Sequence, residues 1–201
     1  MNLFKAVGFF LVSAGFLVVG CSQEKNTRTA VGSVSTPPKM ELEIMKQQAE
    51  QGVAAAQYNL ALMYANGNEV PEDDIEAMKW YRMAAEQGHS LASYRLGVLF
   101  EIDNGVPPDN VEAFKWFRMA AEQGHPRAPY KVAVLYDNGN GVPEDNVEAY
   151  AWYFVAEYFG ENKAVKPQDL IKKELTPSQL KKAGTLAAEY VEQYMEQYNK
   201  K

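Results

Sequence analysis

Residues 73–88 read DDIEAMKWYRMAAEQG, and the stretch returns as DNVEAFKWFRMAAEQG at 109–124 and as DNVEAYAWYFVAEYFG at 145–160. Each copy begins 36 residues after the previous one. When residues 49–84, 85–120 and 121–156 are aligned without gaps, 14 of the 36 columns are identical in all three copies. Such a period predicts a solenoid, because a unit of this size buries its apolar face only by stacking on its neighbours.

The first part of each repeat has the spacing of an amphipathic helix, which we call helix A. In residues 53–66, Ala56, Leu60 and Tyr64 recur at helical intervals. Gly67 and Pro71 follow them. Proline lacks an N–H donor and holds the residue before it in extended geometry, so we expect helix A to end before this loop.

A second helix, helix B, is predicted to open in every repeat at an aspartate, which is Asp73 in the first copy. Asp73 is a suitable N-cap, and Glu76 has the spacing of a capping box, in which the glutamate reaches back to the N-cap. Trp80 is spaced among alanines such as Ala84, which predicts a core that pairs large rings with small side chains. Gly88 provides the left-handed C-cap that ends the helix.

The repeats resemble the Sel-one-like repeat family, relatives of the tetratricopeptide repeats. The family pattern is an Ala-x-Tyr-x-Leu-Gly helix, a Gly-x-Gly-Val-Pro loop, an Asp-x-x-x-Ala-x-x-Trp-Tyr helix and an Ala-Ala-Glu-Gln-Gly close, and the similarity covers residues 49 to about 164. It implies an all-α fold, a right-handed α/α superhelix of about three 36-residue helix-turn-helix repeats with helical caps. It also implies a role in protein interaction and no catalytic residues.

Some positions depart from the family pattern. Ala61 and Ala133 stand where the family favours the glycine kept at Gly97. Pro129 lies within the third helix A, so the opening turn of that helix is not predicted with the others.

Capping helices are predicted at both ends, at residues 39–51 and 161–199, so that the whole solenoid spans 39–199. The first looks like a helix B without its helix A. The second contains Thr176-Pro177-Ser178-Gln179, with threonine at the N-cap, proline at the first helical position and glutamine at the third. Terminal caps of this kind give a solenoid a polar outer face.

The N-terminal residues 1–20 carry one lysine and then an apolar run too short for an ordinary membrane span, which predicts a signal peptide. The run ends in Val18-Val19-Gly20-Cys21, which resembles a bacterial lipobox, and Cys21 is the single cysteine of the chain. The resemblance implies a lipoprotein that is acylated on Cys21, with residues 21–38 as a flexible tether. An uncleaved anchor, or an ordinary secretory signal with an incidental cysteine, is the alternative.

The residue after the cysteine is Ser22, not the aspartate of inner-membrane retention, so we expect an envelope lipoprotein in the outer membrane that faces the periplasm. The chain has 20 basic and 26 acidic residues and a formal charge of −6, which becomes −7 without residues 1–20. An acidic domain without a stripe of lysine and arginine is unsuited to nucleic acid, because phosphate binding needs clustered cations.

No residue pattern points to catalysis, a cofactor or a metal. His89 and His125 share one column, and we interpret them as two solvated turn residues, because a metal pair would need further ligands. The loop at 137–141 lacks the ligand spacing of a calcium loop. Paired carboxylates such as those at 72–74 coincide with helix caps and so do not predict a glycosidase. We therefore expect no enzyme activity.

Helix A carries a second stripe of side chains besides its core stripe. It begins at Tyr58, Tyr94 and Tyr130, and in a tetratricopeptide-like superhelix the A helices line the concave groove. Tyrosine suits recognition because it combines rigid apolar area with a polar tip. The alternative is that these rings only pad helix A against the next repeat.

The variable columns beside the tyrosines are better candidates for specificity. One column holds Asn59, Arg95 and Lys131, and another holds Ala55, Leu91 and Arg127. The candidate groove residues are therefore Tyr58, Tyr94, Arg95, Tyr130 and Lys131.

The sequence thus predicts an envelope-anchored interaction scaffold that binds a protein or peptide in its groove and meets the membrane through the lipid on Cys21. The alternatives are an enzyme or binding protein acting on cell-wall fragments, and a surface protein that contacts a host.

Overall fold

The computed structural model describes residues 38–103 and 107–198, and within these ranges all regular structure is helical. The predicted signal peptide, Cys21 and nearly all of the tether lie outside the described residues. The elements follow one another in the order α1 (Pro38–Glu50), α2 (Ala54–Asn66), α3 (Asp74–Glu86), α4 (Ser90–Glu101), α5 (Asn110–Glu122), α6 (Ala128–Asn138), α7 (Asn146–Tyr158), the 3₁₀ helix η1 (Asn162–Ala164), α8 (Val165–Glu174) and α9 (Pro177–Tyr198).

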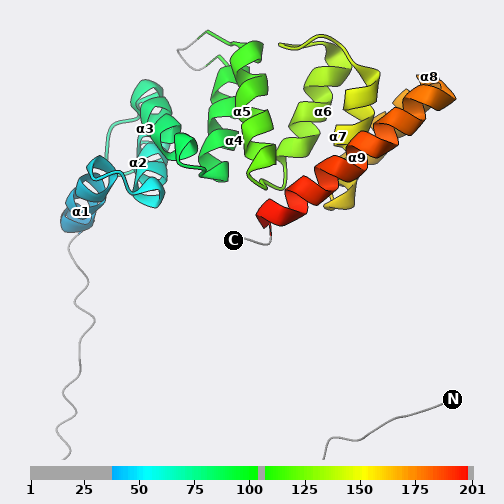
Figure 1. Ribbon diagram of the computed structural model, residues 1–201. Coiled ribbons are helices and arrows are strands. Elements are labelled where there is room, and N and C mark those ends of the chain that lie inside the picture. The colour runs from blue at the N-terminus through cyan, green and yellow to red at the C-terminus, as the bar shows by residue number, and fades with distance from the viewer. Residues whose placement is uncertain (1–37, 104–106, 199–201) are drawn as a thin grey trace, which may run out of the picture. The chain divides into compact units, whose positions relative to one another are not determined.

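The helices form the predicted repeat array. Helix A of the three repeats is α2, α4 and α6, and helix B is α3, α5 and α7. Each helix from α1 to α7 packs against the next helix in the chain, and Figure 1 shows α2 to α7 side by side in chain order. The last helix, α9, packs on α7 and also reaches α5. The fold is an all-α repeat solenoid, as predicted.

The core pairs large rings with small side chains, as the sequence predicts. Tyr81, Phe117 and Tyr153 occupy one column of helix B and are completely buried among alanine columns. A Cβ atom at Gly97 would lie 2.6 Å from the ring of Phe117, so this position of α4 needs glycine for close approach.

The N-caps of helix B are confirmed, but the reciprocal half of the capping box is wrong. Asp73 Oδ1 accepts hydrogen bonds from the N–H groups of Ile75 and Glu76, both at 3.0 Å. The Asp73 N–H donates to the carbonyl of Tyr64 at the end of helix A, and Glu76 pairs with Lys79 instead. Asp109 and Asp145 repeat this arrangement, so the cap also ties helix B to helix A.

Pro129 shortens the third helix A without breaking it. The helix α6 begins at Ala128, whereas α4 begins at Ser90, which is the equivalent of residue 126. Pro129 then lies in the first turn, where its missing N–H leaves no intrahelical hydrogen bond unmade.

Buried and partly buried hydrogen bonds join the repeats at the ends of helix B. Gln87 Nε2 donates to Gln57 Oε1 at 2.7 Å, and Gln57 Nε2 donates to the carbonyl of Ala49. In the next repeat Ser93 Oγ donates to Gln123 Oε1 at 2.8 Å. In the third copy, Pro129 and Phe159 occupy the columns of Gln57 and Gln87, so two apolar residues replace the hydrogen-bonded pair there.

The C-terminal cap closes the array on α7. The helix start predicted at Thr176 is confirmed, and Thr176 and Gln179 form a reciprocal capping box there: the Thr176 N–H donates to Gln179 Oε1 and the Gln179 N–H to Thr176 Oγ1. Tyr190 of α9 stacks on Trp152 of α7 with ring centroids 4.4 Å apart. None of the helices in the described part of the chain is long and apolar enough to cross a membrane.

Candidate functional site

Three hollows on the A helices share lining residues and so form one continuous surface. The first, of about 600 Å³, lies beside the two turns that precede α4 and α6. It shares Leu91, His125 and Pro126 with a second hollow of about 300 Å³, and the second shares Tyr94 and Arg127 with a third of about 420 Å³. We name the residues that line these hollows the A-helix surface: Tyr58, Gly88, His89, Ser90, Leu91, Tyr94, Arg95, Gly124, His125, Pro126, Arg127, Tyr130, Lys131, Glu161 and Lys163.

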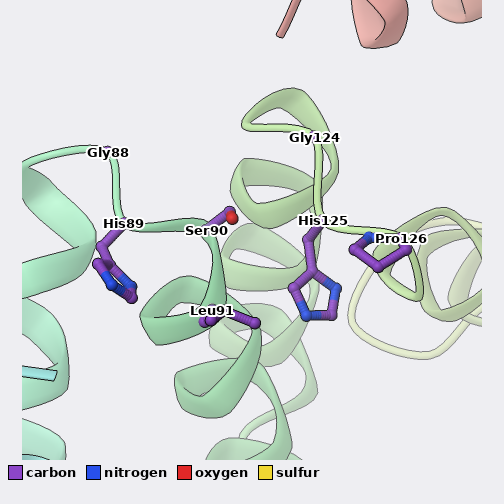
Figure 2. A pocket seen from close by; sticks show the side chains of 7 residues that line it. All are labelled: Gly88, His89, Ser90, Leu91, Gly124, His125 and Pro126. Atoms are coloured by element: carbon purple, nitrogen blue, oxygen red, sulfur yellow. The ribbon is translucent and has the colours of Figure 1, made fainter. Parts of the chain in front are cut away.

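The two histidines are structural parts of this surface, and the prediction that they are solvated turn residues is wrong. His125 is 4% exposed, and its Nδ1 accepts a hydrogen bond from the Arg127 N–H. His89 is half-buried at the N-cap of α4, where its Nδ1 accepts from the Ala92 N–H. Figure 2 shows both imidazoles on the turns that open the helices, with Leu91 on the helix between them.

The physical reason for their burial is a ring stack between successive repeats. The Tyr58 ring stacks on His89 with centroids 4.6 Å apart, and the Tyr94 ring stacks on His125 at 4.1 Å with an interplanar angle of 12°. Each tyrosine therefore packs against the histidine that opens the next repeat, which is the contact that the padding alternative expects. Tyr58, Tyr94 and His125 also line the second hollow, so rings that pack successive repeats together can also contact a ligand.

Tyr130 lies in a different environment because the next repeat has Glu161 where the histidines stand. Its ring is 5.8 Å from that of Tyr153 and lines the third hollow together with Lys163. Burial raises the pKa of the Tyr153 hydroxyl, which donates to Asp137, well above its usual range. This buried ring is therefore neutral and adds no charge to the surface above it.

The basic residues of this surface differ in whether they already form an ion pair. Lys131 pairs with Glu101 of α4 across the repeat boundary and lies 5.5 Å from the Phe117 ring centroid. Arg95 and Arg127 are exposed, and among the described residues neither is in an ion pair. The structure thus brings all five predicted groove residues to one surface, and it gives Lys131 a contact between repeats.

The sequence interpretation missed the contributions of Pro126, Lys163 and the histidines to this surface. The shared column of His89 and His125 was the available signal, since two aromatic side chains 36 residues apart beside a tyrosine column favour stacking. Across residues 38–103 and 107–198, no group of three or more His, Cys, Asp or Glu side chains is placed to hold a metal ion.

Comparison with known proteins places the repeats in a defined group. The Sel1 repeat model matches residues 54–89, 90–125 and 126–156, which together make up just over half of the chain. Each match begins near the start of helix A and so contains one helix A, its loop and one helix B. Sel1 repeat proteins generally mediate protein–protein interactions and are typically not enzymes.

Two solved structures are similar to the chain. A Sel1 repeat protein from Oxalobacter formigenes is 37% identical with a TM-score of 0.59, over 64% of this chain and 97% of that one. A protective antigen present in uropathogenic Escherichia coli strains, which displays an SLR fold, is 29% identical with a TM-score of 0.55, over 84% of this chain and 44% of that one.

A curated relative is similar over a shorter stretch. The secretory immunoglobulin A-binding protein EsiB of Escherichia coli O6:H1, strain CFT073, is 42% identical over 55 residues, which are 27% of this chain. The chain covers 11% of the length of that relative.

Proposed function

The chain belongs to the Sel1 repeat family, and on that premise we propose that it is an envelope-anchored scaffold that binds a protein or peptide along its A-helix surface. One observation supports the choice of surface above others. Three adjoining hollows combine tyrosine rings, the apolar side chains of Leu91 and Pro126, and the exposed guanidinium groups of Arg95 and Arg127. Concave sites with apolar walls and a few oriented polar groups are typical binding sites.

The tyrosines have two roles in this proposal. Tyr58 and Tyr94 stack on the histidines of the following repeat, and both residues also line the second hollow. A ring that is fixed by such packing loses little conformational entropy when a partner binds. Leu91, Arg95 and Arg127, which are more exposed, then determine which partner is bound.

The anchor is the second part of the proposal, and it rests on the sequence. Cys21 follows an apolar run and Val18-Val19-Gly20, which is the arrangement that a lipoprotein signal peptidase requires. We infer that Cys21 is acylated and that the repeats face the periplasm from the outer membrane, at the end of the tether 21–38.

Changing Cys21 to serine is expected to abolish acylation and to move the protein out of the outer-membrane fraction. Serine has no thiol to receive the lipid, and diacylation of Cys21 would supply the two chains that stable membrane retention needs. Metabolic labelling with a palmitate analogue, followed by fractionation, measures both effects. Wild-type protein that takes up no label and fractionates with the free periplasmic proteins would contradict the anchor.

Changing Leu91 to glutamine is expected to weaken partner capture by about tenfold or more, since it removes an apolar contact from the centre of the surface. Val111→Gln is the matched control. Leu91 and Val111 are each the second residue of their helix and are 46% and 49% exposed, but Val111 opens helix B and lines none of the three hollows. Both variants should unfold at nearly the wild-type denaturant concentration.

Capture is measured by chemical cross-linking in intact cells and recovery of the tagged protein. Loss of the same cross-linked species in both variants would show that folding or expression is responsible. Retention of every species by Leu91→Gln would exclude the A-helix surface as the binding site.

A further inference from the structure

The charge of the A-helix surface is opposite to that of the chain. The chain carries 26 acidic and 20 basic residues. Among the residues that line the three hollows, the basic ones are Arg95, Arg127, Lys131 and Lys163, and the acidic one is Glu161. The side chain of Glu161 is engaged locally, because its Oε1 accepts from the Lys163 N–H.

Several acidic residues of the chain make their contacts within the B helices. Asp73, Asp109 and Asp145 accept the first N–H groups of α3, α5 and α7. Glu76 and Glu112 pair with lysines one turn further along the same helices. These carboxylates line none of the three hollows, in which four basic side chains and one acidic one make a cationic area on an acidic protein; Arg95 also lines an adjoining hollow with Glu72 and Asp74.

The two arginines of this surface are available to a ligand. Arg95 and Arg127 are exposed and line the same hollow, and the described residues provide neither with an ion-pair partner. Lys131 is less available because it already pairs with Glu101. A guanidinium group binds a carboxylate through two parallel hydrogen bonds, which gives both affinity and direction.

An apolar site adjoins the arginines. Leu91 and Pro126 are exposed and line both the first and the second hollow, and no Asp, Glu, Lys or Arg side chain lines the first hollow. A ligand that places a carboxylate at Arg95 or Arg127 therefore reaches apolar surface within the same or the neighbouring hollow.

We propose that the A-helix surface binds an acidic protein segment, with an apolar side chain of that segment on Leu91 and Pro126 and its carboxylates on Arg95 and Arg127. This inference rests on the proposed binding function and adds the chemical class of the partner. A polyanion such as nucleic acid does not fit as well, because two free arginines on a net acidic protein neutralise few phosphates and the apolar site would stay empty. An acidic segment uses both features.

The test uses three pooled libraries of short fluorescent peptides and the full chain purified in detergent micelles. The libraries share randomised apolar positions and differ in the fixed residues beside them, which are Asp and Glu, Asn and Gln, or Lys and Arg. We expect the acidic library to bind about ten- to hundredfold more tightly than the amide library, and to lose this advantage at high salt.

Arg95→Glu with Arg127→Glu should remove the preference for acidic peptides and favour the basic library. Lys181→Glu with Lys182→Glu makes the same change of charge at two exposed lysines of α9 that line none of the hollows, and should leave the preference intact. Arg95→Gln with Arg127→Gln is a milder second variant, and circular dichroism checks the helix content of all of them.

The outcomes separate this inference from the proposed function. Equal binding of acidic and amide peptides that Leu91→Gln removes would overturn the acidic partner and leave the binding surface in place. If the wild type binds no library, both proposals fail together. If the chain instead forms a dimer that Arg95→Glu with Arg127→Glu dissolves, the occupant is a second copy and the acidic-segment proposal is wrong.

Discussion

Replacing Trp116 with alanine is expected to lower the free energy of unfolding by about 3 to 5 kcal/mol. Trp116 is 7% exposed and belongs to the main core cluster, among the alanine columns of the central repeat. Helix α5 packs against α4 of its own repeat and α6 of the next one, and the Arg82 guanidinium of the preceding repeat lies 5.6 Å from the Trp116 ring centroid, so loss of the indole would weaken contacts between repeats as well. Denaturant titration followed by circular dichroism measures the change.

Two controls identify the source of this loss. Trp80, which occupies the same column in the first repeat, is only half-buried, so Trp80→Ala should cost less. Trp116→Phe keeps most of the ring and removes an indole N–H that is buried without a hydrogen-bond partner, so it should also cost less than alanine. A loss below about 1 kcal/mol for Trp116→Ala would mean that the indole is a surface residue and a candidate for binding.

Truncating Tyr94 and Tyr130 together to alanine is expected to destabilise the solenoid by about 2 to 5 kcal/mol. Tyr94 packs on His125 and on Phe117, with ring centroids 4.1 and 5.4 Å away, and Tyr130 packs on Tyr153. The change at Tyr94 therefore removes contacts within and between repeats, and the change at Tyr130 removes a contact within its repeat. Thermal and denaturant unfolding of the double variant measure the cost, and partner capture is measured at a temperature where the variant is folded.

Phenylalanine at both positions is the control, because it keeps the ring contacts and removes only the hydroxyl groups. The phenylalanine variant should remain close to wild type in stability. An alanine variant that is as stable as wild type but captures no partner would show that the rings serve binding alone. An alanine variant that folds and captures every wild-type partner would remove the tyrosines from the binding surface.

The repeat architecture could be predicted because it depends on local spacing. The 36-residue period, the aspartate before each helix B and the glycine after it are each sufficient to place a helix boundary. Asp73 caps α3 as expected, and Gly88 has the left-handed φ of +87° that the turn requires. The reciprocal box at Thr176 and Gln179 follows from the same kind of local rule.

Contacts between helices, both within a repeat and between repeats, were harder to predict because they depend on how the helices pack. Glu76 does not reach its N-cap, since the Asp73 N–H is already bound to the carbonyl of Tyr64. His125 is buried because Tyr94 of the preceding helix A covers it. Lys131 pairs with Glu101, which lies 30 residues earlier in the chain. His125 and Lys131 have their partners in the preceding repeat, so the sequence of their own repeat cannot specify these two contacts.

The A-helix surface likewise depends on how successive repeats are placed. The aligned repeats show that the columns holding Leu91 and Arg95 differ from copy to copy. Their convergence with Pro126 and Arg127 of the next repeat into one hollow required the stacked structure.

Photo-cross-linking in living cells tests most directly whether partners contact the A-helix surface. A benzophenone side chain introduced at position 91 lies on helix A, and the same group at position 111 lies at the matched place on helix B, with nearly equal exposure. The proposed function predicts protein adducts from position 91 and none of the same adducts from position 111. Adducts from position 111 alone, or the same adducts from both positions, would contradict a binding site on the A helices.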